Sequence, residues 1–184
     1  MLDGFFRIEE VVLRHELFRG GMSPAITRLC VERGDAAAVL LHRPLDKSVL
    51  LVRQFRYPAW SGDGNGWLWE IVAGTVGKND DPATVAQLEI KEEAGVRVLD
   101  IRHLLSFFMS PGGCSEKCHL YLAVTEEQES PSFPPGANGH FEDLEARWFP
   151  LTKAISMIAN GSIMDAKTII ALQWLQAHLS RDHS

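Results

Sequence analysis

The sequence lacks most of the features that mark membrane, secreted or nucleic-acid-binding proteins. No apolar run approaches the roughly 18 residues of a membrane-spanning helix, and the opening MLDGFFRIEE is acidic where a secretory signal would be basic. Lysine and arginine form no cluster and the formal net charge is −6, which disfavours an electrostatic grip on long nucleic acid. We therefore expect a cytoplasmic protein that binds neither a membrane nor long nucleic acid.

Cysteine is also scarce. The chain has three cysteines, and an odd number favours a reducing compartment over a secreted disulfide scaffold. Cys114, Cys118 and His119 could in principle bind zinc, but no second Cys or His pair follows at the spacing of a zinc finger. The alternation in CHLYLA, which contains Cys118 and His119, is typical of a strand instead.

What the sequence does contain is the composition of one globular domain. Apolar residues make up 46% and charged residues 23% of the 184 residues, which is enough for a sizeable core. No internal repeat and no clean domain boundary interrupts the chain. We therefore expect a single domain over 1–184.

Strand-like and helix-like segments follow one another in a mixed order, which indicates an α/β or α+β layered fold. Strands at 5–18 and 24–33 flank the turn signal GGMSP, and 36–43 and 48–56 form a second hairpin around RPLDK. The other expected elements are a loop at 62–66, strands at 67–74, 97–108, 117–124 and 144–149, a polar loop at 125–140, and helices at 82–94, 152–160 (capped by Thr152) and 166–180 (capped by Asp165).

The stretch GTVGKNDDPATVAQLEIKEEAGV, from Gly74 to Val96, carries the strongest functional signal. Asp81 can cap a helix that starts at Pro82, and Gly95 is a natural terminator. At about 100° per residue, four apolar residues share a core-facing stripe and three glutamates share the adjacent arc. The stripe consists of Ala83, Ala86, Ile90 and Ala94, and the arc of Glu89, Glu92 and Glu93.

Three like charges at helical spacing repel one another. One interpretation is a solvated helix surface, because glutamate favours helices. The other is a metal site, because Mg²⁺ prefers oxygen ligands and carboxylates one turn apart supply them. A bound cation would also remove the repulsion.

The flanking pattern favours the metal site, because the stretch resembles the Nudix box, G-x5-E-x7-R-E-U-x-E-E-x-G-U, where U is a bulky aliphatic residue. The positions in register are Gly74, Glu89, Ile90, Glu92, Glu93, Gly95 and Val96. Two positions depart, with Asp80 in place of the first glutamate and Leu88 in place of the arginine. In the family these two residues pair, so the departures are consistent with each other. We expect Leu88 to pack beneath the loop that begins at Asp80.

The resemblance extends over about 36–180 to the ADP-ribose pyrophosphatase branch of the family, which includes related GDP-mannose hydrolases. The shared segments are LLVRQFR at 50–56, WLWEIVAG before the box, SPGGCSEKCHLYLA at 110–123 and MDAKTIIALQWLQ near the C-terminus. It implies a Nudix-type α/β/α sandwich with a mixed sheet over 36–184. An N-terminal β-hairpin arm over 1–35 would precede the sandwich and join a homodimer.

The resemblance also implies roles for the acidic residues. Glu89 and Glu93 would be the principal ligands of Mg²⁺ or Mn²⁺, with Glu92 joining directly or through water and the backbone carbonyl of Ala73 as a further ligand. Glu92 and Glu93 thereby count as catalytic residues.

The general base is expected from the loop that ends in GHFEDLEA. Glu142 fits best, and the alternatives are Asp143, Glu145 and His140.

Four further residues resemble substrate-binding positions of the branch. Arg56 matches an arginine that holds a phosphate, and Glu116 matches a residue at the sugar or phosphate region. Pro111, sixteen residues past Gly95, resembles a proline that marks ADP-ribose hydrolases, although GDP-mannose relatives carry a similar segment. Glu70 would support the metal ligands from the preceding strand. The simpler interpretations are a surface arginine at 56 and a solvent-facing glutamate at 70.

The expected reaction is hydrolysis of ADP-ribose to AMP and ribose 5-phosphate. GDP-mannose or another sugar nucleotide is the alternative substrate, and a binding module without turnover is the alternative function. Aromatic residues that could stack on the nucleotide base are Phe5, Phe6 and Phe18 in the hairpin, together with the five tryptophans. The sequence does not choose between adenine and guanine.

Overall fold

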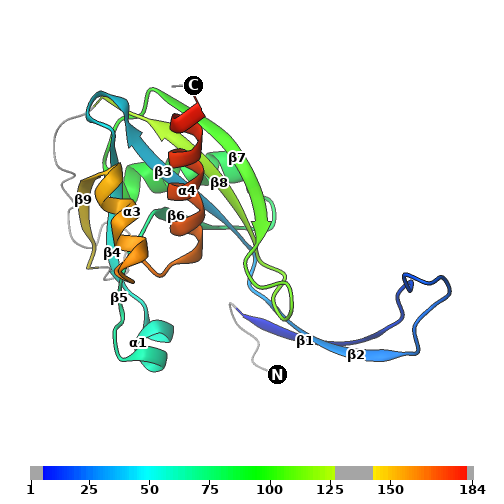
Figure 1. Cartoon of the computed structure of the whole chain (residues 1–184). Helices are drawn as coiled ribbons and strands as arrows, with labels where there is room; N and C mark the ends of the chain where they lie inside the picture. The colour runs from blue at the N-terminus through cyan, green and yellow to red at the C-terminus, as the bar shows by residue number, and fades with distance from the viewer. Residues whose placement is uncertain (1–5, 127–142, 182–184) are drawn as a thin grey trace.

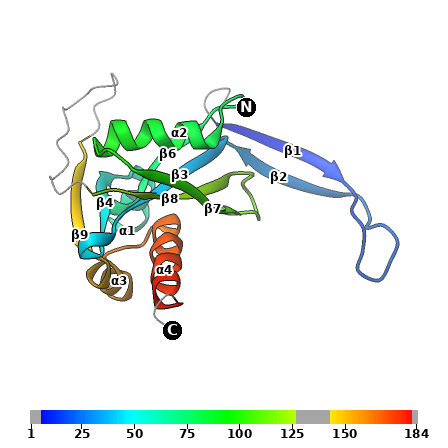
Figure 2. The ribbon, with the colours of Figure 1, turned by 90° about the horizontal axis from the view of Figure 1, so that it is seen from above.

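The computed structural model describes residues 6–126 and 143–181, except the side chain of Asp63. Its strands form two separate sheets. β1 (Arg7–Leu13) and β2 (Ile26–Glu32) make an antiparallel pair that extends away from the body as an arm, as Figures 1 and 2 show from two directions. The expected N-terminal hairpin is confirmed.

The body is built on a seven-stranded mixed sheet with the order β5-β4-β3-β8-β7, in which β6 also pairs with β3 and β9 with β4. The β3–β8 pair is parallel, and the other described pairs are antiparallel. The strands are β3 (Asp35–Arg43), β4 (Ser48–Phe55), β5 (Trp67–Glu70), β6 (Val72–Val76), β7 (Asp100–Phe108), β8 (Lys117–Val124) and β9 (Glu145–Pro150).

Helices cover both faces of this sheet (Figure 2). On one face lies α2 (Pro82–Glu89), which continues as a π-helical segment over Ile90–Ala94. On the other face lie α3 (Leu151–Ala159) and α4 (Ala166–Arg181). The expected α/β/α sandwich is therefore confirmed. None of the helices in the described segments is long and apolar enough to cross a membrane.

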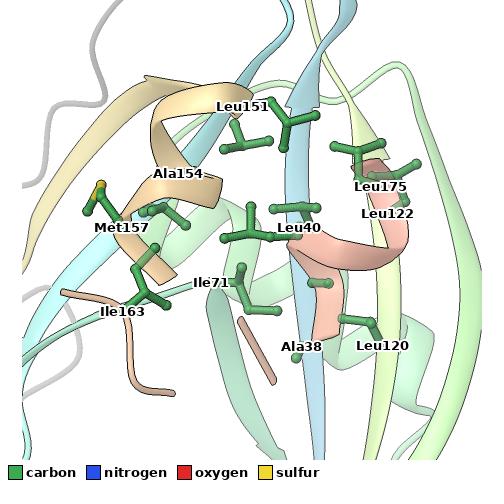
Figure 3. Close-up of a cluster of buried hydrophobic side chains, with 14 of the residues drawn as sticks. Ala38, Leu40, Ile71, Leu120, Leu122, Leu151, Ala154, Met157, Ile163 and Leu175 are labelled. Carbon is green, nitrogen blue, oxygen red and sulfur yellow. The ribbon is translucent and has the colours of Figure 1, made fainter. Parts of the chain in front are cut away.

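Two apolar clusters hold the layers together, one on each face of the sheet. Successive residues of β3 alternate between them, as the period of a strand requires. Ala38 and Leu40 belong to the cluster beneath α3 and α4, which Figure 3 shows. Val39 and Leu41 belong to the cluster beneath α2. A strand buried on both faces reads as a continuous apolar run, which explains why AAAVLL shows no polar alternation.

The structure corrects the sequence at three places. A short helix, α1 (Tyr57–Asp63), follows Arg56 and ends at Gly64, whose φ of 74° suits glycine, so the loop predicted at 62–66 begins later. The single strand predicted at 67–74 is two strands, because β5 pairs with β4 and β6 pairs with β3. Thr152 does not cap α3, which begins at Leu151 directly after Pro150.

Most other elements lie where the sequence placed them. The second hairpin, β7, β8, β9 and both C-terminal helices match within a few residues. Asp165 caps α4 as expected, because its Oδ2 accepts a hydrogen bond of 3.0 Å from the Thr168 amide. The loop predicted at 125–140 lies mainly outside the described residues.

The buried cluster beneath α4 predicts the effect of a core truncation. Leu172 is 0% exposed, so Leu172→Ala should lower the free energy of unfolding by about 2–5 kcal/mol in urea denaturation. Leu45 is 75% exposed, and the same truncation there should change stability by less than about 0.5 kcal/mol. Equal effects of the two substitutions would contradict this assignment of the core.

Candidate active site

The helix that carries the three glutamates begins and ends as the sequence predicts. The Asp81 side chain accepts a 3.0 Å hydrogen bond from the Thr84 amide, Pro82 occupies the first turn, and Gly95 ends the helix with φ 58°. Of the predicted apolar stripe, Ala86, Ile90 and Ala94 are buried, and Ala83 is partly buried against the same cluster. These contacts fix the rotation of the helix and therefore the direction of its acidic arc.

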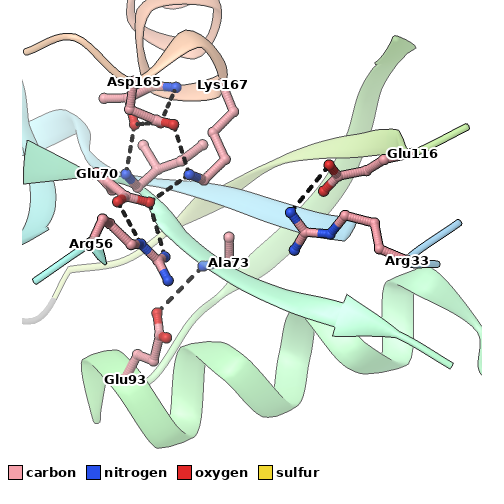
Figure 4. Close-up of polar contacts among 10 residues, drawn as sticks. Arg33, Arg56, Glu70, Ala73, Glu93, Glu116, Asp165 and Lys167 are labelled. Atoms are coloured by element: carbon pink, nitrogen blue, oxygen red, sulfur yellow. Dashed lines mark hydrogen bonds and ion pairs between the residues drawn. The ribbon is translucent and has the colours of Figure 1, made fainter. Parts of the chain in front are cut away.

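Glu93 points from the π-helical segment to the edge of β6. Its Oε2 accepts a hydrogen bond of 3.3 Å from the backbone amide of Ala73 (Figure 4). Within an antiparallel ladder the N–H and C=O of one residue point to the same side. The Ala73 carbonyl therefore faces the same edge, and among the described strands none but β3 pairs with β6.

Glu89 lies against the next residue of the same strand. A Cβ atom added to Gly74 would come within 1.8 Å of Glu89 Oε1, so the carboxylate occupies the space that any other residue would fill. Any side chain at position 74 would therefore have to displace the Glu89 carboxylate from this place. The carboxylates of Glu89 and Glu93 thus lie against consecutive residues of β6.

This donor set fits a hard divalent cation. Three carboxylates from one helix and the Ala73 carbonyl are all oxygen donors, which Mg²⁺ and Mn²⁺ prefer. In residues 6–126 and 143–181 no group of three or more acidic, histidine or cysteine side chains already converges on one point. Repulsion between like-charged carboxylates opposes such convergence. A cation bound beside Glu89, Glu92 and Glu93 would offset this repulsion.

Arg56 and Glu70 lie beside this edge and form a bidentate ion pair. The Arg56 Nε and Nη2 atoms lie 2.8 and 3.1 Å from the two Glu70 oxygens. Glu70 is only 2% exposed, so the solvent-facing interpretation is wrong. Lys167 at the start of α4 also binds Glu70, with 2.5 Å between Nζ and Oε2.

Opposite charges close to one another keep the side chains of Arg56, Glu70 and Lys167 ionised. Burial raises the pKa of Glu70, but the hydrogen bond from Arg56 and the charges of Lys167 and Arg56 outweigh it and lower the pKa below its ordinary value. Burial lowers the pKa of Arg56, and the Glu70 hydrogen bond together with the charges of Glu70, Glu93 and Asp165 raises it overall. Arg56 therefore lies within electrostatic reach of Glu93 on the other side from Glu70 (Figure 4).

Glu116 and Pro111 lie elsewhere, at the base of the arm. Glu116 forms a 3.4 Å ion pair with Arg33, just after β2. Pro111 is exposed in the turn that follows β7, and Val31 of β2 bridges to Cys114 in the same turn. No described contact joins either residue to Arg56 or to the carboxylates of α2, so their expected role in substrate binding stays a prediction.

The candidates for the general base are only partly visible. Glu142 and His140 lie outside the described residues. Glu145 is on β9, where it pairs with Arg147 and lies 4.0 Å from Arg53 Nη1. Asp143 lines a pocket of about 300 Å³ with Arg53, Trp67 and Glu145.

Two further expectations concern Leu88 and the cysteines. Leu88 is 51% exposed, so its predicted packing beneath the Asp80 loop is wrong. Asp80 closes that loop by accepting a 3.1 Å hydrogen bond from the Gly77 amide. Burial raises the pKa of the Cys118 thiol to about 12, whereas a zinc ligand must be a thiolate.

Sequence reasoning also missed Lys167, because a single lysine after Asp165 looks like an ordinary surface residue.

The close approach at Gly74 generates a test of the cation site. Gly74→Ala should displace the Glu89 carboxylate and weaken Mn²⁺ binding by about 10- to 100-fold, measured by electron paramagnetic resonance titration. The matched control is Gly112→Ala, because a Cβ at Gly112 meets no atom within 4 Å. Unchanged Mn²⁺ affinity in Gly74→Ala would show that Glu89 does not hold the cation.

Comparison with known proteins gives the family. Residues 32–172 match the NUDIX domain model. The chain is 33% identical over 184 residues to the ADP-ribose pyrophosphatase of Haemophilus influenzae, and this match covers 98% of this chain and 84% of that protein. It is 35% identical over 175 residues to the ADP-ribose pyrophosphatase of Escherichia coli K12, with coverages of 95% and 83%. The GDP-mannose pyrophosphatase of Salmonella choleraesuis is 37% identical over 150 residues, with coverages of 80% and 77%. With a domain match over most of its length and relatives above 30% identity, the chain belongs to the Nudix family and is a Nudix hydrolase.

Proposed function

We propose that this protein hydrolyses the pyrophosphate bond of a nucleoside diphosphate sugar, with ADP-ribose as the substrate and AMP and ribose 5-phosphate as the products. One observation carries the proposal. The Glu89 and Glu93 carboxylates lie against Gly74 and Ala73 of β6, and the Arg56 guanidinium lies within electrostatic reach of Glu93. Anionic ligands for a cation thus lie beside a cationic group suited to a phosphate.

Each residue has a chemical task in this reaction. Glu89, Glu93 and the Ala73 carbonyl would hold Mg²⁺ or Mn²⁺, and Glu92 would join them directly or through water. A cation held there would neutralise charge on the diphosphate and lower the pKa of water. Arg56 binds a phosphate oxygen with N–H groups that Glu70 does not use. Glu142 removes the proton from the attacking water as the bond between phosphorus and the leaving oxygen breaks, and Glu116 and Pro111 contact the substrate.

GDP-mannose is the second candidate substrate. Relatives named for each substrate cover most of the chain, at 35% and 37% identity. A binding module without turnover is less well supported, because the three glutamates of α2 are all present. Selectivity between adenine and guanine depends on contacts to the base, and Phe6 of the arm is half-exposed with the Arg33 guanidinium 5.6 Å from its ring.

A substrate panel tests the function. Wild-type protein with Mg²⁺ or Mn²⁺ should release AMP from ADP-ribose faster than GMP from GDP-mannose, measured by chromatography. Loss of a residue that only supports a metal ligand lowers activity by roughly 10- to 100-fold. Glu93→Gln removes a proposed ligand itself, so it should reduce the rate by more than this. Exposed Glu126→Gln is the matched control and should retain activity. Wild-type protein that binds but releases no product from any sugar nucleotide would favour the binding module.

We also propose that the arm makes the protein a homodimer. The arm exposes Ile8, Val12, Phe18, Met22 and Leu29. A two-stranded sheet alone is marginally stable in water, and exposed apolar side chains gathered on it favour an interface. In this proposal 1–184 is one domain with 1–35 as the dimer-forming arm.

The protein is cytoplasmic, as its odd number of cysteines favours, and a periplasmic signal in cell fractionation would contradict that location.

The arm predicts a change of assembly state. Val12 and Leu29 lie diagonally on one face of the β1–β2 pair, where Glu10 opposes Leu29 and Thr27 opposes Val12. The double variant Val12→Glu, Leu29→Glu should shift the molar mass from dimer to monomer in light scattering. Exposed Leu45→Glu, in the body, should leave the dimer intact. A monomeric wild type would overturn the proposal.

A further inference from the structure

Four charged side chains form a continuous row from the start of α4 to the edge that carries the glutamates. Asp165 Oδ1 lies 2.8 Å from Lys167 Nζ, and Lys167 Nζ lies 2.5 Å from Glu70 Oε2. Glu70 then binds Arg56 through both of its oxygens. In Figure 4 these side chains point toward one another, and Glu93 lies on the far side of Arg56. Charges along the row alternate in sign.

Stability alone does not explain this row. The Lys167 side chain is 12% exposed and that of Glu70 is 3% exposed, so both charges have lost most of their water. Replacing a buried ion pair by apolar residues is often neutral or stabilising, because desolvation offsets the attraction between the charges. A buried lysine that contacts two carboxylates therefore calls for a role other than holding the fold together.

The contacts of Arg56 indicate what that role is. Glu70 uses two of the five N–H donors of the guanidinium, so three remain for another ligand. The Arg56 side chain is 43% exposed, and it is attracted from the other side by Glu93. Without a fixed partner, such a long side chain would sample many rotamers or pair with Glu93. Either change would remove it from the phosphate or engage a carboxylate that the cation needs.

Lys167 holds Glu70, the ion-pair partner of Arg56, in place. Its ammonium and the Arg56 Nη2 atom share Glu70 Oε2, and Asp165 holds the ammonium from the opposite side. Asp165 is itself held by the helix start, because its Oδ2 accepts hydrogen bonds from the amide and hydroxyl of Thr168. The orientation of Arg56 is thus linked to the first turn of α4 through two carboxylates and one ammonium.

We propose that Lys167 is a positioning residue that holds the Glu70 carboxylate so that Arg56 presents its remaining N–H groups to the diphosphate of the substrate. Lys167 does not touch the substrate in this arrangement. The inference rests on the proposed function for the identity of the ligand, but the grip of Arg56 on a diphosphate can be measured without turnover.

The probe is inorganic pyrophosphate without metal, in isothermal titration calorimetry on the full chain. Lys167→Met should weaken pyrophosphate binding by about tenfold, the loss expected when a supporting residue is removed, and Lys167→Arg should restore part of it. Lys167→Met in the Glu70→Gln background should cause no further loss, because Lys167 acts through Glu70. Exposed Lys153→Met removes the same charge from α3 and should bind like the wild type.

Stability is separated from positioning by a second control on the same helix. Leu175→Ala opens a cavity beneath α4 and should lower the melting temperature while pyrophosphate affinity is kept. The proposal is overturned if Lys167→Met retains wild-type affinity, if its loss is undiminished in the Glu70→Gln background, or if Leu175→Ala loses affinity equally. Wild-type protein that does not bind pyrophosphate overturns it too.

The sugar-nucleotide assay distinguishes this inference from the proposed function. Lys167-dependent pyrophosphate binding without hydrolysis of any sugar nucleotide would contradict the function alone. Hydrolysis with Lys167-independent binding would contradict the inference alone. In the active enzyme, Lys167→Met should raise KM more than it lowers kcat, because the metal ligands on α2 are untouched.

Discussion

The close approach of α2 to the edge of β6 is the constraint on which the rest of the site depends. Gly74 has no side chain, and the Glu89 carboxylate occupies the space that a Cβ would need. One residue earlier, the Ala73 amide donates to Glu93. The apolar stripe of α2 keeps the helix in this rotation by burying Ala86, Ile90 and Ala94. Packing on one side of the helix thus determines where its carboxylates lie on the other.

The division of the predicted strand into β5 and β6 has an equally direct consequence. β5 pairs with β4 and β6 with β3, and Ile71 between them donates its amide to Thr168 of α4 at 2.8 Å. Glu70, the last residue of β5, is therefore close enough to the start of α4 for Lys167 to reach it. A single continuous strand would leave no such break. The separation of the two strands brings charges from both faces of the sheet together.

The π-helical segment sets this α2 apart from a regular helix. It begins at Ile90, directly after Glu89, and contains Glu92 and Glu93. Such segments occur often at functional sites. Leu88 is exposed one residue before Glu89, so no cation from this position neutralises the glutamates. In the proposed site, Arg56 and a bound cation would offset the negative charge at this end of the helix.

The sequence by itself determined the family, the layer order and the acidic helix. Its caps, its apolar stripe and the continuous apolar run of β3 are local patterns that the structure reproduces, because they depend on periodicity and on residues a few positions apart. α1 was missed and Thr152 was wrongly predicted to cap α3, because the local signals of these short helices are weak.

Only the tertiary structure decided the partners of the buried charges. Lys167 and Glu70 are far apart in the chain, and nothing local to either residue encodes their contact. Their pairing depends on where α4 docks and where the sheet divides. Because a buried charge is costly unless it is paired, each charged residue of this row depends on its neighbours in the row.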